Sequence, residues 1–517
     1  MNASMASVNA LLEGWQAQHV ARPCVMVVFG ASGDLCSRKL MPALQRLALR
    51  RELPGGFAVV GVARTQFNDE DFRRFARDAV SKYGAEGPAG SDEVWRSVTE
   101  SFYYVAGDYR DDDTFRRLSA VLGDIDRRNG TGGNRLHYLA VPPAAFPIIV
   151  GALGRHRLNR PARAGTDVFV RIVIEKPYGR DLRTANELDA CVHQVFEESQ
   201  VYRIDHYLGK ETVQNLLALR FANAIFEPIW NGHYVNAIQI TVAESEGVAG
   251  RAGFYEQTGA LRDIVQNHVM QVVALTLMEP PITMNADGIR DEKVKVFRSI
   301  ESLSVDEVQS HVVAAQYAGG WVAGHRVPGY LDEPGVSPTS TTETYVALRL
   351  RADNWRWAGV PLYIRTGKRM PRRMSEVVVQ FHAAPHLPFW PDQTRGLGPN
   401  TLVLRIQPDE GITLLFGGKV PGHGFDVRTV AMDFRYGSAF PGGGPEAYER
   451  LLLDAMLGDP TLFIRADEVM ETWRIVEPIL RCWEEGRKPV ARYLAGTWGP
   501  EAADQLIELD GRRWWTR

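Results

Sequence analysis

A glycine-rich turn between an apolar run and a helical pattern constrains the fold of this 517-residue chain more than any other feature. The apolar run, Cys24 to Phe29, predicts a strand buried in a parallel sheet. It leads into residues 30–35 (GASGDL), and the helical pattern that follows ends near Arg50. Glycines at such a junction let backbone amides approach a pyrophosphate at the helix start. The short glycine spacing alone is weak evidence, and the strand–turn–helix order around it is what favours a dinucleotide site.

Strand and helix patterns alternate from this turn to about residue 200. The alternation predicts a right-handed βαβ series and therefore a Rossmann-like dinucleotide-binding domain of α/β class over residues 23–200. Residues 1–22 have a polar, partly helical pattern and are expected to form an N-terminal extension. The further strand-like runs are Phe57–Ala63, Phe102–Ala106, Leu136–Val141 and Val168–Ile174.

The pattern changes from residue 201 onward, and a domain of α+β class is expected over residues 201–517. A long helical pattern, Glu211 to Ala224, is followed by many strand-like runs separated by turn residues. Strands this numerous and this close predict a large, mostly antiparallel sheet. Its outer face favours assembly into a homodimer or homotetramer. The runs are Asn236–Val242, Thr344–Leu350, Ser375–Phe381, Leu402–Gln407 and Gly411–Phe416.

The composition excludes several classes of protein. With 45% hydrophobic residues the chain is not expected to be disordered, and with 59 basic against 62 acidic residues it is not expected to bind nucleic acid. No apolar stretch approaches the ~18 residues of a membrane helix, so no membrane partner is expected. The four cysteines are scattered without metal-ligand spacing, which predicts no metal site and a reducing, cytoplasmic location.

Two strand ends carry cations where a coenzyme would bind. The second strand ends at Arg64 and Thr65, where an NAD-specific site would present an acidic residue to the ribose. A guanidinium there suits the 2′-phosphate of NADP, although a solvated arginine is the simpler interpretation. Lys176 follows the fifth strand, and the carboxyl ends of parallel strands are where such sheets bind ligands.

Residues 203–211 (RIDHYLGKE) form the densest polar cluster of the chain. If a helix begins near Tyr207, His206 and Lys210 lie four residues apart on one face, which suits a phosphate. His268 lies further on, in an apolar helical run, where a histidine is more often a core residue than a catalyst. A nearby carboxylate would favour a general base instead, but periodicity does not bring Asp205 to His268.

Six segments of the chain resemble the glucose-6-phosphate dehydrogenase family, in its order and at its spacing over nearly the full length. The resemblance implies oxidation of glucose 6-phosphate at C1 to 6-phosphogluconolactone, with hydride transfer to NADP, as the entry step of the pentose phosphate pathway. The segments are GASGDL, EKPYG at 175–179, RIDHYLGKE, the glutamate at 244, RDIVQNHVMQ at 262–271 and IRTGK at 364–368.

The resemblance also implies roles for the matching residues. His268 is expected to be the general base for the C1 hydroxyl, and Asp205 to orient its imidazole. The sugar phosphate is expected to bind His206, Tyr207, Lys210, Glu244, Asp263, Lys368 and Arg373, with Arg372 as the alternative to Arg373. The coenzyme is expected to bind Gly30, Ala31, Ser32, Gly33, Asp34, Leu35, Ser37, Arg64 and Lys176.

Two alternatives remain on sequence grounds. One is a related hexose-phosphate dehydrogenase that uses both NAD and NADP, and it would differ in the residues around the sugar hydroxyls. The other is a catalytically dead regulatory paralogue, which would lack the base or the phosphate-binding cations. Asp205, His206, Lys210 and His268 are all present, which disfavours the paralogue.

Overall fold

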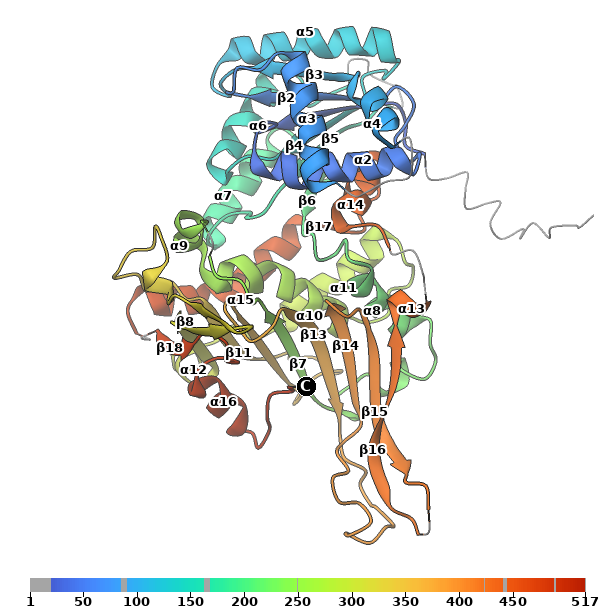
Figure 1. Cartoon of the computed structure of the whole chain (residues 1–517), viewed down its shortest axis with the longest axis vertical. Helices are drawn as coiled ribbons and strands as arrows, with labels where there is room; N and C mark the ends of the chain where they lie inside the picture. The colour runs from blue at the N-terminus through green and yellow to red at the C-terminus, as the bar shows by residue number, and fades with distance from the viewer. Residues whose placement is uncertain are drawn as a thin grey trace, which may run out of the picture. The chain divides into compact units, whose positions relative to one another are not determined.

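The computed structural model describes residues 20–84, 91–161, 168–248, 250–422, 424–439, 444–487 and 490–516, and the chain divides into two compact units (Figure 1). Of the expected N-terminal extension, residues 1–19 lie outside these ranges. Every helix within them is too short or too polar to cross a membrane. The first unit comprises Met1–Gly179, Arg183–Gly209 and Pro445–Ala466, and the second comprises Arg180–Leu182, Lys210–Gly444 and Asp467–Arg517.

In the described part of the first unit, seven strands form one sheet in the order β17-β6-β5-β4-β1-β2-β3. All neighbours are parallel except β17, which runs antiparallel to β6. The strand order reverses at β1, and in such sheets ligands bind beyond the strand ends at that point. This confirms the predicted Rossmann-like domain. The strands are β1 (Val25–Phe29), β2 (Ala58–Ala63), β3 (Phe102–Ala106), β4 (Arg135–Leu139), β5 (Val170–Ile174), β6 (Val201–Ile204) and β17 (Phe463–Ile464).

The helices of this unit follow from apolar stripes with polar ends. In α3, Phe72, Ala76 and Val80 are buried at helical spacing, and the Asn68 side chain accepts the backbone N–H of Asp71 to begin the helix. The helices are η1 (Cys36–Leu40), α2 (Met41–Leu49), α3 (Asp69–Tyr83), α4 (Ser91–Thr99), α5 (Asp112–Asn129), α6 (Phe146–Arg155), α7 (Leu182–His193) and α14 (Ala447–Leu457).

The chain returns to the first unit at Pro445–Ala466, a segment that the expected boundary near residue 200 leaves in the second part. Two arginines attach its helix α14 to strand β5 and helix α2 of this unit. Arg171 of β5 donates to the carbonyl oxygens of Ala455 and Met456, at 2.8 and 2.7 Å. Arg46 of α2 pairs with the buried Glu449 at 3.0 Å. The helix is therefore fixed near both of its ends.

In the described part of the second unit, nine strands form a sheet in the order β16-β15-β14-β13-β7-β12-β11-β8-β18. Only the β7–β12 and β18–β8 pairs of this sheet are parallel, which confirms the predicted mostly antiparallel architecture. The strands are β7 (Val235–Ala243), β8 (Val312–Ala318), β11 (Tyr345–Arg351), β12 (Pro361–Gly367), β13 (Met374–Phe381), β14 (Thr401–Gln407), β15 (Gly411–Lys419), β16 (Val427–Arg435) and β18 (Ala491–Leu494).

The middle of this sheet is buried on both faces, because every residue of β12 is buried. Tyr363 and Tyr345 pack into a cluster with α16 on one face, whereas β12 also contacts η5 and β14 contacts α8. The strands β15 and β16 form a more exposed ribbon at one edge (Figure 1). The helices are α8 (Glu211–Phe221), α9 (Ala252–Ala260), η5 (Leu261–Val269), α10 (Met270–Leu277), α11 (Ala286–Ser299), α12 (Val305–His311), α13 (Tyr436–Ala439), α15 (Ala466–Glu484) and α16 (Glu501–Glu508).

Candidate active site

The glycine turn after β1 has the geometry expected of a dinucleotide loop. Gly30 has a φ of +86°, and a Cβ added there would lie 2.2 Å from the carbonyl oxygen of Ala140, so only glycine fits. Its N–H donates to the Val62 carbonyl at 2.9 Å, and the N–H of Gly33 donates back to the Gly30 carbonyl at 2.9 Å. Backbone hydrogen bonds therefore close the turn at the carboxyl end of β1, where the strand order of the sheet reverses.

The end of β2 joins the glycine turn through side chains. The hydroxyls of Ser32 and Thr65 lie 2.8 Å apart, and the Thr65 carbonyl accepts the Tyr104 hydroxyl at 3.0 Å. Arg64 is exposed beside them, and Asp34 of the turn pairs with Arg38 at 2.6 Å. Because the acidic side chain of this turn already has a cation, the exposed guanidinium of Arg64 gives the end of β2 a positive charge.

The turn that follows β5 holds Lys176 next to a buried carboxylate. Glu175 accepts the Tyr138 hydroxyl at 2.6 Å and the Tyr448 hydroxyl at 3.1 Å, and burial raises its pKa. The Lys176–Pro177 peptide bond is cis. Lys176 itself is half-buried at the carboxyl end of the strand, where the parallel sheet favours a ligand.

Asp205, His206 and Tyr207 lie in a turn after β6, and the helix expected near Tyr207 is absent there, since α8 begins only at Glu211. The condition of a helix start near Tyr207 is not met, because the buried Asp205 side chain accepts the N–H of Tyr207 at 2.9 Å, whereas the helical pattern expected from Glu211 is confirmed by α8. A Cβ on Gly209 would also come within 2.8 Å of the Ala447 carbonyl oxygen, so the turn packs tightly against the start of α14.

Lys210 immediately precedes α8 in the second unit. Its ammonium donates to the Gln407 side chain at 2.8 Å, and Gln407 in turn donates to the Ser375 hydroxyl at 3.0 Å. The Thr212 hydroxyl donates to the Ile406 carbonyl at 3.0 Å, so the start of α8 is held to the end of β14. The ammonium thus donates to a neutral amide that is itself held by a neutral hydroxyl.

Glu244 and Lys368 come together because they follow the adjacent parallel strands β7 and β12. Their side chains pair at 2.8 Å, and the N–H of Glu244 donates to the Gly367 carbonyl at 2.9 Å. The side chain of Lys368 is 12% exposed, and its ammonium lies 5.0 Å from the centre of the Tyr255 ring. Two residues 124 positions apart in sequence thus form one polar pair at a sheet end.

Helix η5 carries Asp263 and the buried His268. It is a π-helix, so residues five apart lie over one another, which places Asp263 and His268 on the same face. The helix begins after a kink at Gly259, whose φ is +64°. Glu343 occupies the space where a Cβ of Gly259 would be, and its carboxylate accepts the N–H of Leu261 at 3.0 Å. Burial raises the pKa of Glu343 to about 7.

Tyr255 links η5 to the polar pair at the sheet end. Burial raises the pKa of its hydroxyl well above the ordinary value, and the nearby carboxylates of Asp263, Glu343 and Glu244 raise it further. With Lys368 over its ring, Tyr255 is surrounded by candidate sugar-binding groups. The structure therefore brings Asp263, Glu244 and Lys368 together around one buried phenol.

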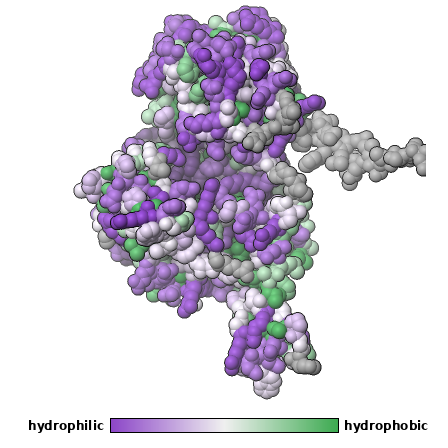
Figure 2. All heavy atoms as spheres, in the orientation of Figure 1, coloured by the Kyte–Doolittle hydropathy of each residue, from purple (hydrophilic) through white to green (hydrophobic). Residues whose placement is uncertain are grey.

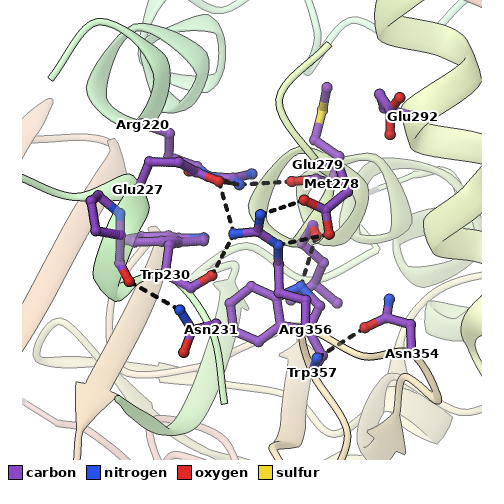
Figure 3. Close-up of polar contacts among 12 residues, drawn as sticks. Arg220, Glu227, Trp230, Asn231, Met278, Glu279, Glu292, Asn354, Arg356 and Trp357 are labelled. Carbon is purple, nitrogen blue, oxygen red and sulfur yellow. Dashed lines mark hydrogen bonds and ion pairs between the residues drawn. The ribbon is translucent and has the colours of Figure 1, made fainter. Parts of the chain in front are cut away.

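The C-terminal ends of α8 and α10 meet in a second charged cluster (Figure 3). Arg220, which is fully buried, donates to the carbonyl oxygens of Leu275 and Met278 at 3.0 and 2.7 Å. Glu227 pairs with both Arg220 and Arg356, at 3.1 and 2.8 Å, and burial lowers the pKa of Arg220 to about 10. This cluster fixes the C-terminal end of α8, which follows Lys210, and that of α10, which follows His268.

The predicted site residues are distributed over both units. Asp205 belongs to the first unit and His268 to the second, so their pairing stays a prediction. Arg373 is exposed just before β13, next to Arg372, which lies 5.8 Å from the Trp498 ring. Sequence patterns gave no sign of Glu343 or Tyr448, because each acts on a segment distant in sequence.

The chain matches two family models. The model described as "Glucose-6-phosphate dehydrogenase, NAD binding domain" matches residues 27–215, and the model of the C-terminal domain of the same enzyme matches residues 217–515. The two models meet near Lys210, where the chain passes from the first unit to the second, and the C-terminal model also covers Pro445–Ala466 of the first unit.

Curated relatives and solved structures agree with these models. "Glucose-6-phosphate 1-dehydrogenase 2" of Mycobacterium tuberculosis (strain ATCC 25618 / H37Rv) is 49% identical over 96% of this chain and 95% of its own length. The enzyme of Aggregatibacter actinomycetemcomitans is 48% identical over 96% and 97%. A solved "Glucose-6-phosphate dehydrogenase in complex with its substrate glucose-6-phosphate" has a TM-score of 0.86 and 31% identity, covering 96% of this chain and 99% of that one. The chain therefore belongs to the glucose-6-phosphate dehydrogenase family.

Proposed function

We propose that this chain oxidises the C1 hydroxyl of glucose 6-phosphate to 6-phosphogluconolactone, with NADP as the hydride acceptor. Relatives at 48–49% identity are named glucose-6-phosphate 1-dehydrogenases, and one solved relative holds the sugar phosphate. The observation that carries the proposal is the cluster of Lys368, Glu244 and Asp263 around Tyr255, next to the helix that bears His268. A cation and carboxylates at one place suit a polyhydroxylated, phosphorylated substrate.

The residues of the first unit fit a dinucleotide. The glycine turn leads directly into a helix, and backbone amides at such a helix start would bind the pyrophosphate. The exposed guanidinium of Arg64 and the hydroxyls of Ser32 and Thr65 would hold the 2′-phosphate, and Lys176 would contact the coenzyme from the end of β5. NADP, when bound, supplies the nicotinamide that accepts the hydride. The other turn residues in contact would be Ala31, Gly33, Asp34, Leu35 and Ser37.

His206, Tyr207 and Lys210 would hold the sugar phosphate. His206 and Tyr207 lie in one turn of the first unit, and Lys210 starts the second unit at the N-terminal end of α8. The ammonium of Lys210, which the Gln407 side chain holds at 2.8 Å, would supply a compact positive charge suited to a dianion. Arg373 is the further guanidinium that the family motif assigns to this role.

The proton step belongs to His268. Its imidazole would take the proton of the C1 hydroxyl as the hydride leaves C1, and Asp205 would hold the ring in the productive tautomer and stabilise its positive charge. Glu244, Asp263 and Lys368 would fix the hydroxyls so that C1 reaches a near-attack position. A buried base excludes water from this transfer, and His268 is 1% exposed.

The proposal is tested by the rate of NADPH absorbance increase with glucose 6-phosphate. Parallel assays replace NADP by NAD and the substrate by unphosphorylated glucose. We expect fast turnover only with the phosphorylated sugar, and a higher kcat/KM with NADP than with NAD. Equal rates with both coenzymes would favour a dual-specificity hexose-phosphate dehydrogenase, and no turnover would favour a regulatory paralogue.

Self-association through the edge ribbon of the second unit forms part of the proposal. Val430, Met432 and Phe434 of β16 alternate onto one face and are 40%, 61% and 37% exposed. Their partners on β15 are Phe416, Leu414 and Ile412, so this face carries apolar residues on both strands, and Figure 2 shows green residues among purple and white ones over this edge. A face of this kind suits a second copy of the chain.

Sedimentation velocity of the full chain tests this assembly. The wild type is expected to sediment as a dimer or tetramer, and Met432→Asp to shift it toward monomer. Thr429→Asp, on the opposite face of the same strand, serves as the control and leaves the assembly intact. A monomeric wild type would contradict the proposal. Cytoplasmic location stays a prediction that rests on the free cysteines, and cell fractionation checks it.

A further inference from the structure

We infer that Tyr448 is a positioning residue for the phosphate-binding imidazole of His206. Tyr448 lies on α14, 242 residues beyond His206, and no local motif links the two. Their rings lie nearly parallel, with centroids 6.3 Å apart and an interplanar angle of 17°. The inference rests on the proposed phosphate role of His206, and both residues belong to the first unit.

The Tyr448 ring has a fixed position because its other end is anchored. Its hydroxyl donates to the Glu175 carboxylate at 3.1 Å, and burial and this carboxylate raise the pKa of the phenol, which keeps it a donor. Arg171 holds the C-terminal end of α14 and Arg46 its N-terminal end. An aromatic ring with a tethered hydroxyl and a clamped backbone has little freedom to move away from the imidazole.

The backbone of the His206 turn is pressed onto the same helix. Gly209 approaches the Ala447 carbonyl so closely that a Cβ would come within 2.8 Å of it. The turn thus meets α14 twice in succession, at Ala447 by backbone and at Tyr448 by ring stacking. Stacking of this kind orders a half-exposed imidazole before the phosphate arrives, and so reduces the entropy lost on binding.

Tyr448 also connects the two ligand regions of the first unit. Glu175, which accepts its hydroxyl, immediately precedes Lys176, the proposed coenzyme contact. The Tyr138 hydroxyl donates to the same Glu175 oxygen at 2.6 Å, but Tyr138 is fully buried on β4 and has no ring contact with His206 among those described. Tyr138 therefore offers a matched control that removes a hydroxyl from Glu175 without removing a ring from His206.

Steady-state kinetics of the full-length enzyme test the inference. Tyr448→Leu is expected to raise the KM for glucose 6-phosphate about 10-fold with kcat changed less than about 3-fold, and Tyr448→Phe to raise it about 3-fold. Tyr138→Phe is expected to leave this KM unchanged. An unchanged KM in both Tyr448 variants, or an equal rise in Tyr138→Phe and Tyr448→Phe, would overturn the role of the ring.

A double-mutant cycle separates positioning from general structural damage. His206→Asn removes the imidazole, so adding Tyr448→Phe to it should raise the KM no further. Additive increases would show that Tyr448 acts elsewhere and would overturn the inference. If His206→Asn alone leaves the KM for glucose 6-phosphate unchanged, the proposed phosphate role of His206 fails first, and this outcome is distinct from a failure of Tyr448.

Discussion

The two units present their candidate residues in different ways. In the first unit the coenzyme groups stand on turns at strand ends, and Arg64, Thr65 and Asp34 are exposed. In the second unit His268 is buried within a helix, and Lys368 is paired at a sheet end. Exposed turn residues contribute little to folding, whereas buried charged groups are expensive to place. The exposed residues proposed to bind the coenzyme can therefore be substituted with little loss of stability. Substitution of the buried residues proposed to bind the sugar also affects folding.

The largest expected effect tests the buried side. His268→Asn should lower kcat by about 10²–10⁴-fold, because a general base contributes rate enhancement of that order, while glucose 6-phosphate still binds. Stopped-flow absorbance and substrate titration measure the two quantities. His233→Asn, in an exposed loop of the same unit, is the control and should retain full turnover. Near-wild-type turnover in His268→Asn would remove the base from the proposed mechanism.

The second effect concerns how the buried Glu343 makes the stability of the second unit depend on pH. Glu343 has its pKa raised from 4.5 to about 7 by burial, so the native state holds this proton more tightly than the unfolded state. Its contribution to the free energy of unfolding is complete below pH 4.5 and is lost as pH rises through 7. The difference between the two pKa values corresponds to about 3 kcal/mol.

Glu343→Gln should remove that loss while its amide oxygen still accepts the N–H of Leu261. Thermal unfolding between pH 5 and pH 8 is expected to show a smaller fall in Tm for the variant than for the wild type. The exposed Glu301→Gln is the control and should follow the wild type. Parallel pH profiles for the wild type and Glu343→Gln would show that the carboxyl does not titrate in this range.

The third effect tests the exposed side. Arg64→Ala should weaken NADP binding by about 10–100-fold, because it removes a charge-assisted hydrogen bond to the 2′-phosphate. NAD binding should change less than about 2-fold, and Tm should hardly move, since the side chain is exposed. Fluorescence titration with each coenzyme measures both affinities. Arg77→Ala, whose guanidinium pairs with Glu70 on α3, is the control. An equal loss of affinity for NAD and NADP would show that Arg64 does not bind the 2′-phosphate.

The smallest expected effect concerns the Thr65 hydroxyl, next to Arg64 at the end of β2. Thr65→Val keeps the shape of the side chain but removes the hydroxyl that lies 2.8 Å from Ser32. A single neutral hydrogen bond contributes about 0.5–1.5 kcal/mol, so NADP affinity should fall about 2–12-fold. The same titration checks this. A fall as large as that of Arg64→Ala would mean that the hydroxyl pair shapes the turn itself.

The sequence predicted the fold around the proposed coenzyme residues well, because the signals there are local. The apolar strand, the glycine turn and the cation after β2 all lie within 65 residues of the start, and the structure places the turn at the switch point of the sheet. The end of β3 and the two fold classes were likewise predicted from periodicity.

The remaining features depend on segments distant in sequence. The start of α8 at Glu211 agrees with its helical pattern, but the turn before it does not follow from periodicity, because Asp205 and the distant Ala447 hold those residues. The π-helical form of η5 was not predicted, since the kink at Gly259 and the carboxylate of Glu343, 84 residues later, set its beginning. Helical periodicity carries no information about such partners.

The return of the chain to the first unit has a consequence for synthesis in the cell. The edge strand β6 receives its partner β17 only when residues 463–464 have been made, after the whole sheet of the second unit except β18. At ribosomal rates of roughly 5–20 residues per second, β6 remains an unpaired edge for about 10–50 s. An open edge of a parallel sheet is a site of aggregation, so the nascent chain has a defined interval in which a chaperone would protect it.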